Sequence, residues 1–281
     1  MALPDFLLIG AMKSATSSLR LSLSTHPDLS FGAKHEPNSL ASPDVMTASG
    51  RRRYEDLYSA AQPGQLLGDG STAYSKMPDV VGVPQRAREL LGPDIRIVYS
   101  VREPIARAES HHHYLWNRQQ VPRRFEEALE LSPGIRDYSC YAMQLQAWLD
   151  VFPIDQIKIV RFEDYVNNPT AVLNELLAFL GLEEGSAKPV GPANVSAELR
   201  ATGFGFKLSQ NSAYRRVMRP LLTPKMRQRM VRVSNPHAGE SPLPPEPDTR
   251  AALAERFAED ARGITPSMGP EASRMAYSVS A

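Results

Sequence analysis

Short apolar runs alternate along the chain with longer segments in which apolar positions recur at helical spacing. The runs are almost continuously apolar, as is typical of parallel strands buried on both faces, and they lie at 5–10, 65–70, 95–101 and 156–162. The helical segments are one through Leu19, Leu21 and Leu23, then 84–91, 104–118, 137–150 and 169–180. This alternation predicts βαβ units and an α/β fold, with a central parallel sheet flanked by helices.

The pattern changes after Gly181, which is itself a helix stop signal. Residues 199–247 are basic and then proline-rich, and we expect them to form a cap of helices and loops. Residues 248–263 predict an amphipathic closing helix, and 264–281 predict a mobile tail. The sequence therefore predicts a single domain over 1–263, with a basic C-terminal extension and no internal repeat.

Composition is that of a globular protein in water. The chain has 281 residues, of which 42% are hydrophobic and 22% are charged. Its one cysteine, Cys140, rules out an internal disulfide and fits a reducing compartment. No window approaches the ~20 apolar residues of a membrane span, and the first residues lack a basic leader. We therefore expect a cytoplasmic protein.

Charge is balanced overall at +1 but unevenly distributed. Between Leu199 and Gly239 there are nine Lys or Arg residues and no Asp or Glu. Such a block is either a solvated basic face or a surface for a polyanion or an anionic membrane. We expect no nucleic-acid partner. Contact with a membrane surface is less favoured than a solvated basic face.

Residues 9–18, "IGAMKSATSS", follow the first apolar run and suggest a phosphate-binding turn. A Lys and four hydroxyls stand between a strand and a helix start, where backbone N–H groups can hold an anion. The turn is three residues shorter, from Gly10 to Lys13, than the loop that binds nucleoside triphosphates. It can wrap one terminal phosphate-like group. The alternative is an ordinary helix start capped by Ser or Thr.

A second anion signal is "VYSVREPIARAES" at 98–110. Arg102 ends a predicted strand, Pro104 suits a first helical turn, and Ser110 lies two turns further on. An Arg offers a planar fork to phosphate and a Ser offers one hydroxyl. The alternative is that Arg102 pairs with a carboxylate such as Glu103.

Together and in this order, the two segments resemble sulfotransferases that use 3′-phosphoadenosine 5′-phosphosulfate (PAPS). The resemblance implies a P-loop-kinase-like sheet and assigns Arg102 and Ser110 to the 3′-phosphate. It assigns the 5′-phosphosulfate to Lys13, Ser14, Ala15, Thr16, Ser17 and Ser18. Further similar blocks are "THPDL" (25–29), "GDGSTAY" (68–74), "YAMQLQAWLDVFPIDQIKIVRFEDYVNNP" (141–169) and "LLAFLGL" (176–182). The most similar branch acts on glycans, including heparan sulfate, and has bacterial relatives.

The resemblance also implies a mechanism and an acceptor site. Lys13 is expected to stabilise the leaving phosphate oxygen, and Glu36 in "FGAKHEPNSL" to act as general base, with His35 as the alternative base or a substrate contact. The acceptor is expected to be a hydroxyl of a sugar or of a glycosylated small metabolite. Other expected substrate contacts are Ser71, Tyr74 and Tyr138. The resemblance implies no metal, and it implies that Glu163 braces loops.

Two other functions stay open, and the sequence departs from the family at two points. Asp69 could hold Mg²⁺ in a nucleotide or small-molecule kinase that uses ATP, and a non-catalytic anion-binding protein could keep the same fold.

The three adjacent histidines at 111–113 point about 100° apart on a helix, so they cannot hold one metal ion. Gly70 stands where several glycan enzymes carry a basic residue, and "HEPNSL" lacks the usual aromatic pair.

Overall fold

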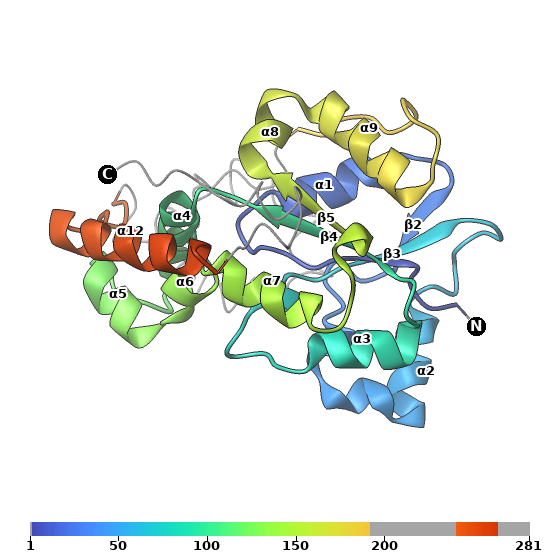
Figure 1. Ribbon diagram of the computed structural model, residues 1–281, viewed down its shortest axis with the longest axis horizontal. Helices are drawn as coiled ribbons and strands as arrows, with labels where there is room; N and C mark the ends of the chain where they lie inside the picture. The colour runs from blue at the N-terminus through green and yellow to red at the C-terminus, as the bar shows by residue number, and fades with distance from the viewer. Residues whose placement is uncertain (1, 192–239, 264–281) are drawn as a thin grey trace, which may run out of the picture.

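Five parallel strands form the centre of the computed structural model, which describes residues 2–191 and 240–263 (Figure 1). Their order across the sheet is β2 (Leu29–Phe31), β3 (Leu66–Gly70), β1 (Phe6–Leu8), β4 (Arg96–Val101) and β5 (Ile157–Arg161). The predicted α/β fold with a parallel central sheet is confirmed. Four of the strands fall within the predicted apolar runs, and β2, only three residues long, was not predicted.

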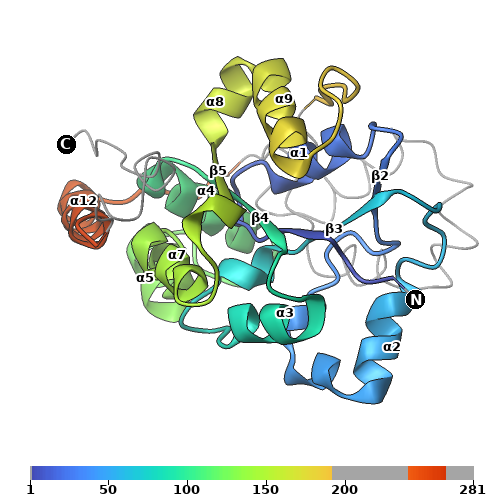
Figure 2. The same cartoon turned by 45° about the vertical axis from the view of Figure 1, so that its right-hand side comes forward.

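Helices cover both faces of this sheet (Figures 1 and 2). On one face, Leu19, Leu173 and Leu177 join Leu8 and Val98 in an apolar cluster. The helices of that face are α1 (Thr16–Leu23), α8 (Phe162–Asn167) and α9 (Pro169–Leu180). The opposite face carries α2 (Ala48–Asp56), α3 (Val83–Leu91) and α7 (Tyr141–Leu149). The strands are thus buried on both sides, as their continuous apolar runs predict.

A third apolar cluster lies at the end of the sheet where β4 leads into α4. It contains Ile105, Trp116 and Phe125 together with Leu253 and Phe257. The helices that build it are α4 (Pro104–Asn117), α5 (Phe125–Leu131), α6 (Gly134–Asp137) and α12 (Pro247–Ala261). Among the helices of the described ranges, none is long and apolar enough to cross a membrane.

The single helix predicted over 137–150 is wrong at its start. The chain forms α6, turns, and begins α7 only at Tyr141. In the turn, Ser139 Oγ accepts a hydrogen bond from the buried Arg107 Nε, and Cys140 has ψ 80°, outside the helical region. The demand of Arg107 for acceptors therefore outweighs local helix propensity here.

Helix α12 lies where the sequence predicts a closing helix over 248–263, and it packs against α4 and α7. The carboxylate of Asp260 accepts hydrogen bonds from the backbone N–H groups of Ala142 (2.8 Å) and Met143 (3.1 Å) in the first turn of α7. Most of the predicted basic cap and the predicted tail, at 192–239 and 264–281, lie outside the described residues. The division into one domain and a tail stays a prediction.

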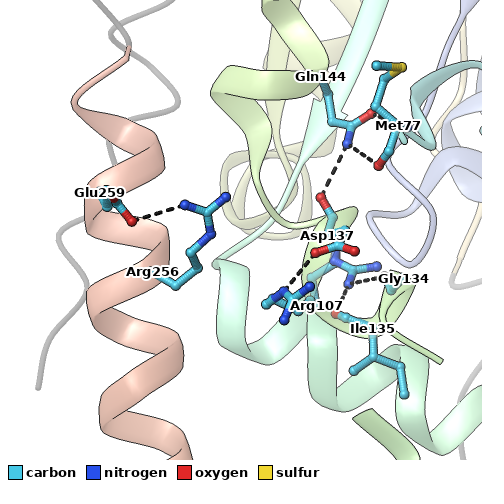
Figure 3. Close-up of polar contacts among 9 residues, drawn as sticks. Met77, Arg107, Gly134, Ile135, Asp137, Gln144, Arg256 and Glu259 are labelled. Carbon is cyan, nitrogen blue, oxygen red and sulfur yellow. Dashed lines mark hydrogen bonds and ion pairs between the residues drawn. The ribbon is translucent and has the colours of Figure 1, made fainter. Parts of the chain in front are cut away.

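Asp260→Ala should lower the free energy of unfolding by about 1–2 kcal/mol, because it removes the cap of α7 and leaves two N–H groups without an acceptor. The measurement is urea denaturation followed by circular dichroism. The matched control is Glu259→Ala, which removes only an exposed ion pair with Arg256 and should change stability by less than about 0.5 kcal/mol (Figure 3). Equal losses in the two variants would contradict the capping role.

Candidate functional site

The turn between β1 and α1 is held in an unusual backbone conformation. Gly10, Lys13 and Ala15 have φ of 139°, 74° and 62°, in or beside the region that L-residues rarely adopt. A side chain at Gly10 would collide with Ser75 Oγ, which donates a hydrogen bond to Ile9 O at 2.9 Å. Such strain persists only where surrounding contacts impose it, and it is typical of functional sites.

The N-terminus of α1 lacks the side-chain cap that a helix start commonly has. Its N-cap residue, Ala15, makes no side-chain cap, and its first turn contains no acidic residue. The N–H groups of a first helical turn have no partner within the helix and carry a partial positive charge. Hydroxyls surround them: Ser14 and Ser18 are buried, and Thr16 and Ser17 are half-buried. This arrangement suits an anion, and it does not match the alternative of a helix capped by Ser or Thr.

Arg102 lies directly beside this turn, because β1 and β4 are neighbours in the sheet. Its Nη1 donates to Lys13 O at 3.5 Å, and its guanidinium carbon lies 4.5 Å from the centre of the Phe162 ring. The alternative pairing with Glu103 is not adopted. Glu103 instead caps α4, accepting from Ile105 N at 2.9 Å and Ala106 N at 2.6 Å.

Two further expectations concern α4 and the loop beside it. Ser110 lies half-buried two turns into α4, and its role at a 3′-phosphate stays a prediction. Glu163 Oε1 accepts from Glu103 N at 3.0 Å, so its carboxylate joins the first turn of α8 to the N-cap of α4, and the bracing of loops stays a prediction.

Lys13 has no hydrogen bond or ion pair of its ammonium within the described ranges. Its Nζ lies 5.0 Å from the centre of the Tyr114 ring. Burial lowers the pKa of Lys13, and three neighbouring guanidinium groups lower it further: those of Arg102, Arg118 and Arg107. An anion bound beside Lys13 would stabilise the charged ammonium, because its negative charge offsets both the burial and the repulsion from the arginines.

Glu36 faces the same region from the loop between β2 and α2. Both of its carboxylate oxygens accept from Thr72 Oγ1, at 3.3 and 3.2 Å. The Glu36 carboxylate is half-buried, whereas the neighbouring His35 is exposed. The charge of Glu36 also acts on the pKa values of Tyr114 and Lys76, so all three lie in one neighbourhood.

A buried carboxylate, Asp69, anchors that loop to the end of β3. It accepts from Ser71 Oγ at 2.6 Å and from the hydroxyls of Tyr54 and Tyr74, both at 2.7 Å. Burial raises the pKa of Asp69, and these hydrogen bonds oppose the rise. Ser71 and Tyr74 in turn accept from the backbone N–H groups of the Glu36 loop, at Asn38 (2.9 Å) and Leu40 (3.2 Å).

These hydrogen bonds place the hydroxyls of Ser71 and Tyr74 inside the protein, where they support the Glu36 loop. Direct contact of either residue with a substrate stays untested. The space beside Gly70 is occupied by Arg20, whose Cδ lies 3.4 Å from the position of an added Cβ. Arg20 also donates to Gly32 O at 3.3 Å, so a basic side chain from α1 stands beside the position where the sequence lacks one.

Tyr138, the C-cap residue of α6, lies close to Lys76 and His111. Its hydroxyl donates to Asp79 Oδ2, its ring stacks on that of His111 at 5.7 Å, and Lys76 Nζ lies 5.7 Å from its centre. Burial lowers the pKa of Lys76, and the charge of Glu36 opposes this. Sequence reasoning missed Lys76, because only the fold brings it from the end of the 3₁₀-helix η3 (Thr72–Ser75) to this surface.

Two polar side chains brace this side of the site (Figure 3). Gln144 Nε2 donates to Met77 O at 3.0 Å and to Asp137 O at 3.2 Å, which fixes the segment that follows Lys76. The buried Arg107 donates through Nη2 to Ile135 O and more weakly to Gly134 O at 3.5 Å. Its charge acts on Lys13, so it adds to the positive field at the turn.

The three histidines of α4 point to different partners, as their helical spacing predicts. Burial, with Arg107 second, lowers the pKa of His111 to about 2. His112 Nε2 lies 2.9 Å from Pro122 O, and His113 packs against Trp116. Within residues 2–191 and 240–263, no group of three or more His, Cys, Asp or Glu side chains is arranged to hold a metal ion.

Comparison with known proteins connects this geometry to one family. A family model described as a sulfotransferase domain matches residues 3–191. Heparan sulfate glucosamine 3-O-sulfotransferase 3B1 of Mus musculus is 30% identical over 192 residues, which cover 64% of this chain and 47% of that protein. The bifunctional heparan sulfate N-deacetylase/N-sulfotransferase of Drosophila melanogaster is 28% identical over 224 residues, covering 65% of this chain and 20% of that protein.

The chain thus spans about half the length, or less, of these curated relatives. Among solved structures, a sulfotransferase from Alicyclobacillus acidocaldarius has the same fold, with a TM-score of 0.66 and 23% sequence identity. That alignment covers 95% of this chain and 96% of the other.

Tyr74→Phe should lower the free energy of unfolding by about 1–3 kcal/mol, since it removes a donor to the buried Asp69 and the acceptor of Leu40 N. Tyr138→Phe is the matched control: its hydroxyl contacts an exposed carboxylate, and its loss should cost less than about 1 kcal/mol. Both are measured by chemical denaturation. Unchanged stability of Tyr74→Phe, with a raised KM for the acceptor, would instead assign Tyr74 to substrate contact.

Proposed function

The chain belongs to the sulfotransferase domain family, and we propose that it transfers a sulfuryl group from PAPS to a hydroxyl of a sugar or of a glycosylated small metabolite. One observation carries the proposal: the uncapped N-terminus of α1 lies beside two cationic side chains from adjacent strand ends. Neither Lys13 nor Arg102 forms an ion pair within the described ranges. An anion with two separated acidic groups would satisfy both.

The residues divide the donor between them as follows. The N–H groups of residues 15–18 and the hydroxyls of Ser14, Thr16, Ser17 and Ser18 hold the 5′-phosphosulfate, and Lys13 faces the oxygen that bridges phosphorus and sulfur. Arg102 binds the 3′-phosphate through its guanidinium fork, with Ser110 adding a hydroxyl. The short turn suits this donor, because it surrounds one terminal group at the reacting end.

The transfer itself is an in-line displacement at sulfur. The acceptor oxygen forms a bond to sulfur while the bond from sulfur to the bridging phosphate oxygen breaks. The acceptor proton passes to the carboxylate of Glu36, and the electron pair of the broken bond remains on the phosphate oxygen, where the Lys13 ammonium stabilises it. The charge of Lys13 and the dipole of α1 supply the positive field, so we expect transfer without an added divalent metal.

The kinase alternative has less support. Both carboxylate oxygens of Asp69 already accept hydroxyl hydrogen bonds, and its side chain is fully buried, so a Mg²⁺ ion would have to displace them. A non-catalytic anion-binding protein would need no carboxylate facing the turn, whereas Glu36 is held in place by Thr72. The specific acceptor follows from neither observation.

Arg102→Ala should weaken the binding of 3′,5′-adenosine bisphosphate by about 10- to 100-fold, because the 3′-phosphate loses charge-assisted hydrogen bonds. The measurement is calorimetric titration without Mg²⁺. Arg51→Ala, which removes an exposed arginine paired with Glu55 on α2, is the control and should bind like the wild type. Binding of ATP with Mg²⁺ by the wild type, and none of the bisphosphate, would favour the kinase instead.

Glu36→Gln should lower kcat by about 10²- to 10⁴-fold while leaving bisphosphate affinity unchanged, since only proton removal from the acceptor is lost. The rate is followed with radiolabelled donor on a sugar acceptor identified by screening the wild type. His35→Gln serves as control and should keep kcat within a few-fold. The reverse order of effects would assign the base to His35, and two silent variants would support the non-catalytic alternative.

A further inference from the structure

The aromatic ring of Tyr114 lies close to two cations, Lys13 and Arg118. Lys13 Nζ is 5.0 Å from the ring centre, and the guanidinium carbon of Arg118 is 4.3 Å from it. Tyr114 belongs to the last turn of α4, and Arg118 follows that helix directly, four residues on. One side chain therefore contacts cations from two separate segments of the chain.

This contact gives the Lys13 ammonium its only attractive partner in the described part of the chain. Its other close charges, on Arg102, Arg107 and Arg118, are repulsive. The face of an aromatic ring attracts a cation within about 6 Å, and more strongly where water is partly excluded. Without the ring, the ammonium would be free to turn away from the α1 N-terminus into solvent.

Tyr114 has no other evident task in the core. Its neighbours Leu115 and Trp116 join the apolar cluster beneath α4, whereas Tyr114 belongs to none of the apolar clusters within the described residues. Its side chain is half-buried. Charges on both sides of the site act on its hydroxyl, because the pKa of Tyr114 is raised by burial, lowered by Arg118 and raised by Glu36.

We infer that Tyr114 is the positioning residue for Lys13 and that it orders Arg118 as a further cation for the anionic oxygens of the donor. An ammonium has three N–H donors, so Lys13 can remain over the ring while it donates to a ligand oxygen. The Arg118 guanidinium lies near the same ring and forms no hydrogen bond or ion pair with the other described residues, so its donors can reach a ligand. The inference rests on the proposed function, because it assumes that a polyanionic nucleotide occupies the turn.

The first test reads the ring contact without any ligand. Lysines are dimethylated with ¹³C-formaldehyde, which keeps their charge, and the Lys13 signal is assigned from its absence in Lys13→Arg. In the wild type and in Tyr114→Phe, the Lys13 methyl signal should be shifted upfield by the ring current. In Tyr114→Leu it should move to the position of exposed lysines. A signal that does not move would overturn the contact.

The second test measures what the contact does for binding, by calorimetric titration with 3′,5′-adenosine bisphosphate. Tyr114→Leu should bind about 5- to 30-fold more weakly than the wild type, and Tyr114→Phe within about two-fold, because the ring and not the hydroxyl attracts the cations. Arg118→Gln should bind about three- to ten-fold more weakly. Arg51→Gln, which removes the same charge from α2, should bind like the wild type.

The outcomes separate this inference from the proposed function. If the wild type binds the bisphosphate and Tyr114→Leu binds equally well, only the inference is overturned. If the wild type does not bind it while the ring-current shift is present, the proposed donor site fails, and the positioning role fails with it. A melting temperature of Tyr114→Leu close to that of the wild type, together with rescue by Tyr114→Phe, would exclude general unfolding as the cause of weaker binding.

Discussion

The parallel pairing of β1 with β4 is the constraint on which the whole site depends. Leu8 lies opposite Val98 in this pair, and both strands end at the same edge of the sheet. The backbone continues the pairing past the end of β1, since Ser100 N in β4 donates to Gly10 O at 2.7 Å. A shift of register would separate the turn from Arg102, and neither segment alone would hold two acidic groups.

Concentrating positive charge at one edge is unfavourable for the empty protein, and neighbouring elements offset this. The guanidinium of Arg107 is held by carbonyl oxygens and a hydroxyl, and Arg102 rests on Phe162. At the end of β3, the carboxylate of Asp69 accepts hydrogen bonds from three hydroxyls and pairs with neither Lys13 nor Arg102. Within the described residues neither Lys13 nor Arg102 forms an ion pair, so their positive charge remains available to a ligand.

The sequence predicted those parts of the molecule that local chemistry determines. Among the described residues, the apolar runs located four of the five strands. Pro104 correctly marked the start of α4, and Gly181 correctly marked the end of α9. The sequence predicted that the turn with Lys13 and the strand end with Arg102 bind an anion, and the fold brings the two segments together. Their anion-binding role, and their assignment to particular groups of a donor, stay predictions.

What the sequence did not predict depends on contacts between distant segments. Tyr114, Lys76 and Arg118 carry no motif, and they join the site only through the packing of α4 and η3. The break between α6 and α7 arises because Arg107, some thirty residues earlier, takes Ser139 Oγ as an acceptor. The brief β2 has too few residues for a periodic pattern to emerge.

The contact between Gly10 and Ser75 also limits how such a protein can be diversified. Gly10 begins the turn between β1 and α1, whereas Ser75 ends the η3 segment that starts at Thr72, the partner of Glu36. The backbone of Gly10 thus packs directly against the side chain of Ser75, and a Cβ added at Gly10 would overlap Ser75 Oγ. A chimaera that takes residues 72–75 from a relative should therefore keep a side chain no larger than serine at position 75 wherever it also keeps the turn at Gly10.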